Sequence, residues 1–421
     1  MDSFKKYTFI VLFLLLSSQN VFSQSPFLPF FYNIYSIPND STYEVFYTFR
    51  IANDKLVFEK NDDIWKAGFK ISIEITDTLG NFVYRTSKDK DVNEDGFEAT
   101  NYNDKYTQGV LNFNLKPGSY RLSSLFYDNN SGSEFKLRPV TIKLDVKDEK
   151  QSLTPIIVNA YMRGQDDDFI VTNFEGNIPF DELEYNILIP VKDTNVKQIN
   201  VIVVNNKDTV YNSYVKEYIQ SSLTIKEEDN TILLDNSAED KIYNVFILRN
   251  LSRHLTEGPL NIYVSNDDLL DEKPFFKLVK WYNKPISLSD SEFAIESLQF
   301  IEKQDTIEKM LDQPAEEYFS ELFKYWERVD PTPNTKFNPL MKEYYSRVDY
   351  AARSFSSVSG KNGLHTDRGK VYIQYGKPKD INRTSDNLGK VVEIWTYERP
   401  NLTFYFIDEK GTGEFTLKNR G

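Results

Sequence analysis

The chain has 421 residues, of which 40% are hydrophobic and 15% aromatic, so it can bury substantial cores and is not globally disordered. Its formal net charge of −13 repels nucleic acids and anionic lipid surfaces at long range, and we expect no nucleic-acid binding. The absence of cysteine excludes disulfides, thiol catalysis, thiolate zinc sites and a lipid-modified N-terminal cysteine.

Residues 1–23 have the pattern of a cleavable secretory signal peptide. Lys5 and Lys6 precede an apolar run over residues 7–16, which is too short to span a bilayer. The alternative is an uncleaved N-terminal anchor. No second run of this kind follows. We therefore expect an exported chain that is not a lipoprotein and has no transmembrane segment after cleavage. It would lie in the periplasm, at the outer-membrane periphery or outside the cell.

Two β-rich domains are expected before residue 285. Short aromatic and β-branched runs, separated by Pro, Gly and Asn turns, are typical of an immunoglobulin-like β-sandwich. In the first domain, residues 24–148, strands are expected at 45–51, 69–75, 82–84, 110–115, 120–126 and 140–146. In the second, sandwich-like domain, residues 152–284, strands are expected at 156–161, 185–191, 199–204, 243–248, 260–264 and 275–281.

The hydrophobic period lengthens near residue 288, which predicts an α+β domain over residues 288–421. Helices are expected over residues 293–301, after Pro314 and from Pro339 onwards. An antiparallel β-meander should follow, with strands at residues 370–375, 391–397, 402–407 and 414–417. The chain as a whole is therefore predicted to be mainly β, with two immunoglobulin-like sandwiches before this C-terminal domain.

One segment combines turn chemistry, charge and apolar patterning: Gly363-Leu364-His365-Thr366-Asp367, followed by Arg368 and Gly369 and then by Gly376 and Pro378. Trp326 and the helix stop Asp330-Pro331 lie upstream of it. Residues from about 290 to 421 resemble the C-terminal domain of the GWxTD-domain proteins, a family named for a Gly-Trp-x-Thr-Asp motif. Leu364 stands where that motif has its Trp.

The resemblance implies an exported bacterial envelope protein in which β-sandwich modules precede the C-terminal domain, and it implies no reaction. If the motif Trp is a ligand-stacking surface, Leu364 removes it. If it is a packing plug, Leu can fill most of its place. The residues that match the family motif are Trp326, Asp330, Pro331, Gly363, Thr366, Asp367, Arg368, Gly369, Gly376 and Pro378.

The motif admits a structural and a chemical interpretation. Thr366 and Asp367 can bond backbone N–H groups two or three residues on, and so organise the entry into the strand expected at 370–375. Alternatively, they form an exposed carboxylate–hydroxyl pair at an active site. His365 could act as a base only beside a serine and an orienting carboxylate, and the chain has no Gly-x-Ser-x-Gly elbow.

Positive charge gathers around the motif, in contrast to the acidic chain as a whole. An anionic partner, such as an acidic protein face, a glycan acid or a phosphate-bearing lipid headgroup, would suit this excess. Alternatively, the lysines guard the strand edges of a solvated hairpin. The basic residues are Lys361, Arg368, Lys370, Lys377, Lys379 and Arg383, against Asp367 and Asp380.

A second candidate site lies in the first domain. Asp91, Asn93 and Asp95, with Gly96 after them, match the opening of an EF-hand-type calcium loop. The twelfth position is Tyr102 rather than Glu, and β patterns flank the segment. The two interpretations are a Ca²⁺ ion that stabilises a sandwich edge and an acidic solvated loop. No other cofactor or metal is expected.

No catalytic constellation is recognisable in the sequence, so we expect a non-enzymatic envelope protein. It would act as a protein–protein interaction or assembly module, with another envelope protein as its partner. The alternative is an envelope hydrolase or a carbohydrate-binding protein with a site near Asp367. Glycan binding would require an exposed aromatic platform, for which Trp281 and Trp395 are candidates.

Overall fold

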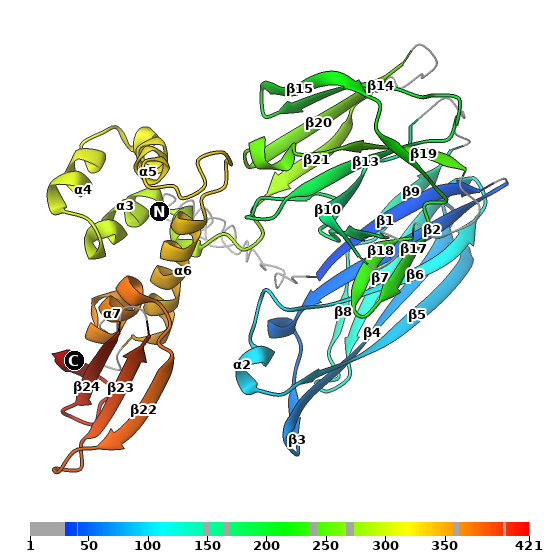
Figure 1. Cartoon of the computed structure of the whole chain (residues 1–421). Coiled ribbons are helices and arrows are strands. Elements are labelled where there is room, and N and C mark those ends of the chain that lie inside the picture. Colours follow the sequence, from blue (N-terminus) through cyan, green and yellow to red (C-terminus); the bar gives the residue numbers. More distant parts are fainter. Residues whose placement is uncertain are drawn as a thin grey trace, which may run out of the picture.

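The computed structural model describes residues 30–420, except 40, 146–151, 164–167, 236–241, 267–272, 357–359, 361 and 399–400. The predicted signal peptide therefore lies outside the described residues. Two β-rich units and a C-terminal unit of helices and strands follow one another along the chain (Figure 1). The fold is mainly β, as the sequence predicts.

The first unit has two antiparallel sheets with a core between them. One sheet has the order β1-β2-β6, with β1 (Phe30–Asn39), β2 (Thr42–Ala52) and β6 (Tyr106–Leu115). The other contains β3 (Glu59–Asn61), β4 (Ile64–Asp77), β5 (Phe82–Glu94), β7 (Gly118–Asp128), β8 (Glu134–Lys136) and β9 (Val140–Leu144). The 3-10 helix η1 (Asn53–Lys55) and the short helix α2 (Phe97–Thr100) connect strands.

Strand β2 is buried on both of its faces. Val45 and Tyr47 point into the core between the two sheets. Phe46 points the other way and joins Val158 and Leu188 of the second unit in a separate apolar cluster. Because side chains alternate across a strand, one strand serves two cores. The first two units are therefore joined by apolar packing.

The second unit is also built from two sheets. A seven-stranded sheet has the order β16-β19-β13-β10-β11-β18-β17 and a five-stranded sheet the order β12-β21-β20-β14-β15. The strands are β10 (Ile156–Arg163), β11 (Asp168–Val171), β12 (Ile178–Pro179), β13 (Tyr185–Val191), β14 (Ile199–Asn205), β15 (Asp208–Val215), β16 (Tyr218–Ser221), β17 (Ile225–Glu228), β18 (Thr231–Leu234), β19 (Tyr243–Leu248), β20 (Gly258–Ser265) and β21 (Phe275–Lys280), with the 3-10 helix η2 (Ser252–His254) before β20.

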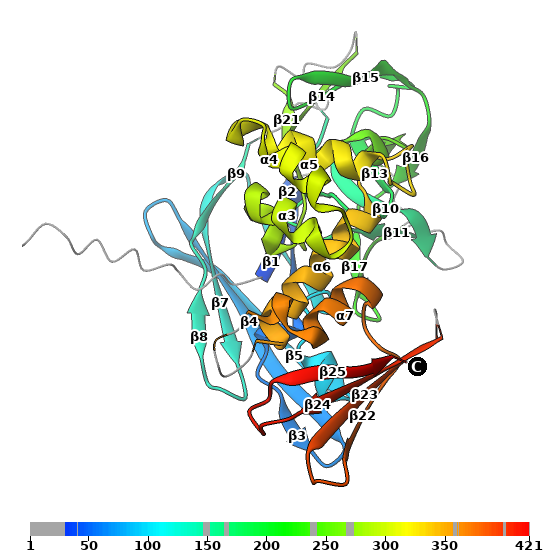
Figure 2. The same cartoon turned by 90° about the vertical axis from the view of Figure 1, so that its left-hand side faces the viewer.

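In the C-terminal unit, helices precede a four-stranded antiparallel meander of order β22-β23-β24-β25 (Figure 2). The helical elements are η3 (Ile286–Ser289), α3 (Ser291–Ser297), η4 (Leu298–Phe300), α4 (Gln304–Leu311), η5 (Ala315–Glu317), α5 (Tyr318–Glu327), α6 (Pro339–Ser354), η6 (Gly363–His365) and α7 (Asp367–Tyr375). The strands are β22 (Asp380–Ser385), β23 (Val391–Tyr397), β24 (Leu402–Asp408) and β25 (Phe415–Arg420). No helix in the described part of the chain combines the length and apolar character needed to cross a bilayer.

One apolar core runs from the second unit into the C-terminal helices. Phe337, which precedes α6, has its ring centroid 5.3 Å from the rings of both Phe180 and Trp281 in the second unit. The same core continues through Trp326 and Tyr345. The second and C-terminal units are therefore held together by shared packing, in addition to the connecting chain.

The strand predicted at residues 370–375 is wrong, because this segment belongs to helix α7. The side chain of Thr366 caps the helix, and Gly376 ends it with a φ of 78°. Val371 and Ile373 are both buried because α7 packs against α6 and β25. The two-residue spacing of Val371 and Ile373 therefore arises because α7 is covered by other elements on more than one side.

The first strand of the meander is instead β22, directly after α7. All six of its side chains are exposed, so its sequence shows no apolar alternation. β22 pairs with β23 in antiparallel register, with Ile381 opposite Trp395. The motif segment therefore lies between two helices, α6 and α7, rather than between a helix and a strand.

Candidate functional site

The motif residues from Gly363 to Gly369 form a tight turn between α6 and α7. The Thr366 hydroxyl donates to the Gly363 carbonyl at 2.7 Å and accepts from the Gly369 N–H at 3.1 Å. Thr366 is 4% exposed, so water does not replace these bonds. Asn362 supports the turn by accepting from Leu364 N at 3.1 Å. The predicted hydrogen bond between the Thr366 side chain and a backbone N–H is present, but it caps the start of a helix rather than the start of a strand.

Replacing Thr366 with Val should lower the free energy of unfolding by about 1–3 kcal/mol, because it removes the helix cap and takes the hydroxyl acceptor away from the Gly369 N–H. Val keeps the branched shape, so the loss reports the hydroxyl. Urea unfolding followed by circular dichroism measures it. Thr366→Ser keeps the hydroxyl and should lose less than half as much. Equal losses in the two variants would contradict the capping role.

Gly363 and Gly369 let three backbone segments approach closely. A Cβ on Gly363 would lie 2.1 Å from the carbonyl oxygen of Ala351 at the end of α6. A Cβ on Gly369 would lie 1.9 Å from the carbonyl oxygen of Gly363. Backbone atoms at these distances must move to accept a methyl group. Both motif glycines are therefore required for packing, and neither has a positive φ.

Gly369→Ala is expected to lower the free energy of unfolding by about 2–3 kcal/mol through this clash. Intrinsic helix propensity alone would favour alanine by about 1 kcal/mol, so the two effects have opposite signs. Gly96→Ala is the matched control, because nothing lies within 4 Å of its added Cβ, and it should change stability by less than about 1 kcal/mol. A neutral or stabilising Gly369→Ala would show that the turn is not tightly packed.

Leu364 occupies a packing position. It is 3% exposed and belongs to the core that α6, α7 and the meander share. Where the family motif has Trp, this chain has a buried aliphatic side chain and no ligand-stacking surface. His365 next to it is exposed, and its ring centroid lies 6.1 Å from that of Phe300. In the described part of the chain, no hydrogen bond joins His365 or His254 to a serine or a carboxylate.

Asp367 and Arg368 tie α7 to the meander. An Asp367 carboxylate oxygen accepts from Leu417 N at 2.9 Å. Arg368 Nη1 lies 3.1 Å from Glu393 Oε2, and Nη2 donates to the Gly413 carbonyl at 3.2 Å. The Arg368 guanidinium also lies 4.2 Å from the ring centroid of Phe415. Both motif side chains therefore have partners within the protein.

Glu393 lies at the centre of a set of contacts with Arg368, Arg383 and Trp395, which we call the brace, and is 2% exposed. Its Oε2 also accepts from the Trp395 indole at 3.3 Å, and its Oε1 lies 2.6 Å from Arg383 Nη2. Two guanidinium groups and an indole therefore surround this carboxylate. A cleft of about 430 Å³ lies beside the brace, with Tyr350 among its lining residues.

The upstream motif residues lie elsewhere. Trp326 is 2% exposed, and its indole donates to the Tyr345 hydroxyl at 3.5 Å. Asp330 accepts from Thr332 N at 2.7 Å and so holds the turn after α5, in which Pro331 is exposed. Trp326 and Asp330 line a different pocket from Arg368. Asp367, Arg368 and Trp326 therefore do not converge on one cleft.

The end of α7 completes the motif. The Gly376 carbonyl accepts from the Tyr397 hydroxyl at 2.9 Å, which ties the helix end to β23. A Cβ on Gly376 would also lie 3.0 Å from the Arg347 guanidinium carbon. Pro378 is buried just before β22. Gly376 and Pro378 therefore mark the passage from the end of α7 to β22, whereas Thr366 marks the start of α7.

Most of the basic residues around the motif have acidic partners. Lys377 lies 3.0 Å from Glu98 of the first unit, and Lys379 pairs with Glu398. Arg368 and Arg383 share Glu393, Lys370 is exposed on α7, and Lys361 is outside the described residues. These pairings favour the interpretation of a solvated surface over that of an anion-binding patch.

Asp91 and Asn93 lie on strand β5 and Asp95 just after it, and all three are exposed. Asp91 is opposite Gly68 and Asn93 opposite Lys66 on β4, so the segment is extended rather than looped. Glu94 between them is buried and accepts from Asn53 Nδ2 at 2.7 Å. No group of three or more metal-ligating side chains gathers among the described residues. Calcium binding here stays a prediction, to be tested by a calcium-dependent rise in Tm that Asp95→Asn removes.

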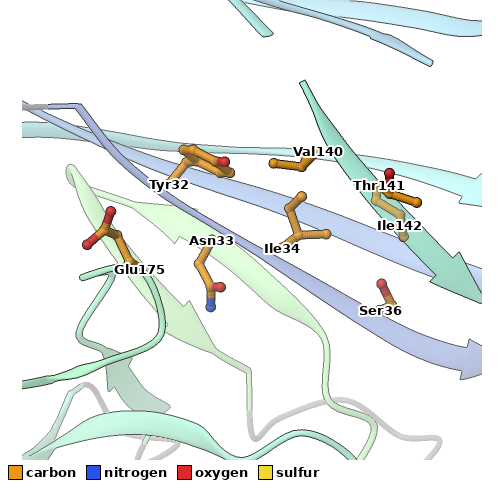
Figure 3. Close-up of a pocket in the computed structure, with 8 residues that line it drawn as sticks. All are labelled: Tyr32, Asn33, Ile34, Ser36, Val140, Thr141, Ile142 and Glu175. Carbon is orange, nitrogen blue, oxygen red and sulfur yellow. The ribbon is translucent and has the colours of Figure 1, made fainter. Parts of the chain in front are cut away.

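A shallow pocket of about 400 Å³ lies on the first unit, between β1 and β9 (Figure 3). Tyr32, Ile34 and Val140 lie along it in Figure 3, with Glu175 at one end. Among the described residues that line it, Glu175 is the only carboxylate, and the Tyr32 hydroxyl is the other ionisable group.

A larger cleft of about 790 Å³ lies where all three units meet. Its walls come from β2 and the segment before β6, from residues 170–185 of the second unit, from residues 281–286 and from α6. Arg50 of β2 lines it. Sequence reasoning missed this site, because its residues are separated by up to three hundred positions and carry no motif. The one feature of the sequence that could have indicated this cleft is Arg50, a single arginine within the apolar strand β2.

The helices packed on an antiparallel meander, braced through the motif turn, define the C-terminal unit as an α+β domain with a structural motif. The GWxTD domain family model matches residues 262–419, which confirms the resemblance seen in the sequence. The match begins within β20 and so includes the last strand of the second unit. No curated protein matches the chain.

Proposed function

We propose that this chain is an exported, non-enzymatic envelope protein that serves as an assembly module for another envelope protein. The observation that supports this most directly is the use of the motif side chains. Thr366, Asp367 and Arg368 all bond within the fold. A catalytic site needs reactive groups directed at a space that substrate can enter. The motif instead holds the C-terminal unit in shape.

The packing between the units also supports an assembly role. Apolar clusters join the first unit to the second and the second to the C-terminal unit. Glu227 of the second unit also binds two lysines of the first, with Lys88 Nζ at 2.6 Å. Such joints restrict relative domain motion, because large apolar interfaces are costly to open. A protein that presents surfaces at fixed positions benefits from this rigidity.

Export rests on the predicted signal peptide, and the absence of cysteine makes the mature chain a non-lipoprotein. The mature protein isolated from its native host should begin near Gln24 and appear in the periplasmic, outer-membrane or extracellular fraction. Mass spectrometry of the intact chain and cell fractionation measure both. A mature chain that retains residues 1–23 would instead identify an N-terminal anchor.

Chemical cross-linking in intact native cells tests the assembly role. The mature chain should be recovered with an envelope protein in a defined complex. A variant without residues 2–23 stays inside the cell and is the control for non-specific capture. Recovery of monomer alone, or of the same partners with both chains, would argue against the proposal.

The alternative function, a hydrolase or carbohydrate-binding protein with a site near Asp367, is favoured only by the cleft beside Arg368 and Tyr350. Asp367→Ala distinguishes the two functions. It removes the hydrogen bond that the Asp367 carboxylate accepts from Leu417 N and leaves the contacts of Glu393 in place. Full rescue of a null strain by the folded variant would reject a site at Asp367. Loss of rescue with an unchanged Tm would support it.

A further inference from the structure

The cleft where the three units meet has the size of a small-molecule site. Its volume is about 790 Å³, within the range of about 300–1,000 Å³ typical of ligand pockets. Aromatic residues from two units line it, including Tyr106, Phe174, Trp281 and Tyr282. The rings of Phe174 and Tyr282 stack at 4.5 Å. The lining is therefore rich in aromatic side chains.

Arg50 is the charged group that the cleft leaves uncompensated. Its guanidinium carbon lies in the corner formed by two nearly perpendicular rings, 3.7 Å from the centroid of Tyr106 and 3.8 Å from that of Phe174. Nη1 donates to the Thr172 carbonyl at 3.1 Å, whereas the buried Nε has no partner. Within the described part of the chain, no carboxylate lies within ion-pairing distance of Arg50. Burial lowers the pKa of Arg50 to about 10, so it remains charged at neutral pH.

Three of the four acidic groups that line the cleft have other partners, and the fourth, Asp104, is exposed. Asp181 accepts from the Tyr185 hydroxyl at 2.7 Å and from Leu183 N at 2.9 Å. Asp349 of α6 accepts from two backbone N–H groups of η3. Glu182 at the rim pairs with Lys342 at 3.1 Å. Arg50 is thus left with donors that no acidic side chain satisfies.

A second unpaired donor points to the same conclusion. The indole Nε1 of Trp281 is buried and has no hydrogen-bond partner, and Trp281 is among the residues that line the same cleft. A buried donor without a partner costs about 1–3 kcal/mol relative to a bonded one. Arg50 and Trp281 together favour a ligand that brings acceptor oxygens. The planar guanidinium, fixed by its two rings, matches the two oxygens of a carboxylate.

We propose that this cleft binds a small monocarboxylic acid with an aromatic body, its carboxylate on Arg50 and its ring among the aromatic side chains. The formal charge of the lining decides between anions. Four basic residues face four acidic ones, namely Arg50, Lys284, Lys342 and Arg353 against Asp104, Asp181, Glu182 and Asp349. The lysines of the lining pair with Glu182 and Glu257. Arg50 therefore balances one negative charge, and the second charge of a dianionic phosphate would have no free buried cation among the described residues that line this cleft.

The test uses the full mature chain and two acids, each with its neutral amide. Phenylacetate represents a free small acid, and N-acetylphenylalanine represents the C-terminal residue of a peptide. Isothermal titration or ligand-observed NMR at pH 7.5 should show at least one acid binding about tenfold or more tightly than its amide. Phenyl phosphate should bind more weakly than phenylacetate. Equal binding of acid and amide, or no saturable binding of either acid at about 10 mM, would overturn the proposal.

Arg50→Met removes the charge and keeps an apolar stem against the rings, so it should abolish the preference for acid over amide. Arg353→Met is the matched control at the exposed rim and should keep affinity within about threefold. If acid preference persists in Arg50→Met or disappears in Arg353→Met, the rim binds the acid and the proposal fails.

If Arg50→Met does not fold, two milder variants test whether the cleft binds the carboxylate. Trp281→Phe keeps the ring contacts with Phe180 and Phe337 but removes the indole N–H, and it should weaken acid binding severalfold. Asp181→Asn removes a negative charge that acts on Arg50 and should strengthen acid binding about threefold without changing amide binding. Unchanged acid affinity in both variants would overturn the proposal.

Discussion

Glu393→Ala is expected to lower the free energy of unfolding of the C-terminal unit by about 3–5 kcal/mol, the cost of breaking a buried ion pair from one side. The side chain of Arg368 is 12% exposed and that of Glu393 is 3% exposed. Without the carboxylate, the guanidinium of Arg368 is left in a site that water hardly reaches. The Trp395 indole loses its acceptor as well. Urea unfolding followed by tryptophan fluorescence measures the loss.

Arg383→Ala is the matched control for this prediction, because it removes a partner of the same carboxylate from the solvent side. The Arg383 side chain is 69% exposed, and an exposed ion pair contributes about 0–1 kcal/mol. Glu393 keeps Arg368 and Trp395 in this variant. Similar small losses for Glu393→Ala and Arg383→Ala would show that the brace does not stabilise the unit. The family motif would then lack the structural role assigned to its arginine.

Lys277→Met is expected to raise the free energy of unfolding at pH 7 by up to about 3 kcal/mol. Lys277 lies on β21 opposite Leu260, so its side chain points into the core of the second unit, and it is 7% exposed. Burial without a compensating charge lowers its pKa to about 8 from the ordinary 10.5. At neutral pH the folded protein must therefore hold a charge in an apolar layer. Methionine fills similar space without that charge.

The same pKa fixes how stability depends on pH. Below about pH 8, Lys277 is protonated in both the folded and the unfolded chain, and its unfavourable contribution is constant. Between about 8 and 10.5, the unfolded chain binds a proton that the folded chain has released, so stability rises with pH. Buried tyrosines such as Tyr35, whose pKa is raised to about 12 by burial, act in the opposite direction above about pH 10.

Urea midpoints at pH 7 and pH 9.5 for wild type and variant separate these effects. The gap between Lys277→Met and wild type should be largest at pH 7 and should narrow at pH 9.5. Lys207→Met is the control, because Lys207 is exposed in the turn between β14 and β15 and should change stability by less than about 0.5 kcal/mol at either pH. A gap that is independent of pH would mean that folding does not lower the pKa of Lys277.

Much of the β architecture could be predicted from local patterns. Strands β13 and β19 begin and end where the sequence predicts them, because continuous apolar runs bounded by polar residues leave little choice of register. Helix α6 begins at Pro339, where the proline and the preceding Asn338 form a recognisable start. Such elements carry their own boundary signals.

Helix α7 and strand β22 could not be predicted by the same means. The cap residue Thr366 and the terminating Gly376 were visible, but the spacing of Val371 and Ile373 suggested a strand. The helix is decided by its position between α6 and the meander. β22 is exposed throughout and is defined only by its pairing with β23. Both outcomes depend on neighbours that are remote in sequence.

For the candidate sites too, local interactions could be predicted from the sequence and long-range contacts could not. The sequence indicated that Thr366 would organise a turn, because capping is a local interaction. It gave no sign that Arg368 would reach Glu393 or that Arg50 would lie against Tyr106 and Phe174. Those arrangements depend on how separate units pack. The aromatic platform expected from Trp281 and Trp395 is not exposed, since both side chains are at least 94% buried.

The core that passes from the second unit through Trp281 and Phe337 into the helices limits how this protein can be divided by recombination. A gene fragment that begins at residue 288 would encode Phe337 without Phe180 and Trp281, and its product would expose the apolar face that they cover. Transfer of the C-terminal unit to another protein therefore requires the neighbouring sheet to move with it. In this chain, the packed core extends beyond the segment that the motif marks.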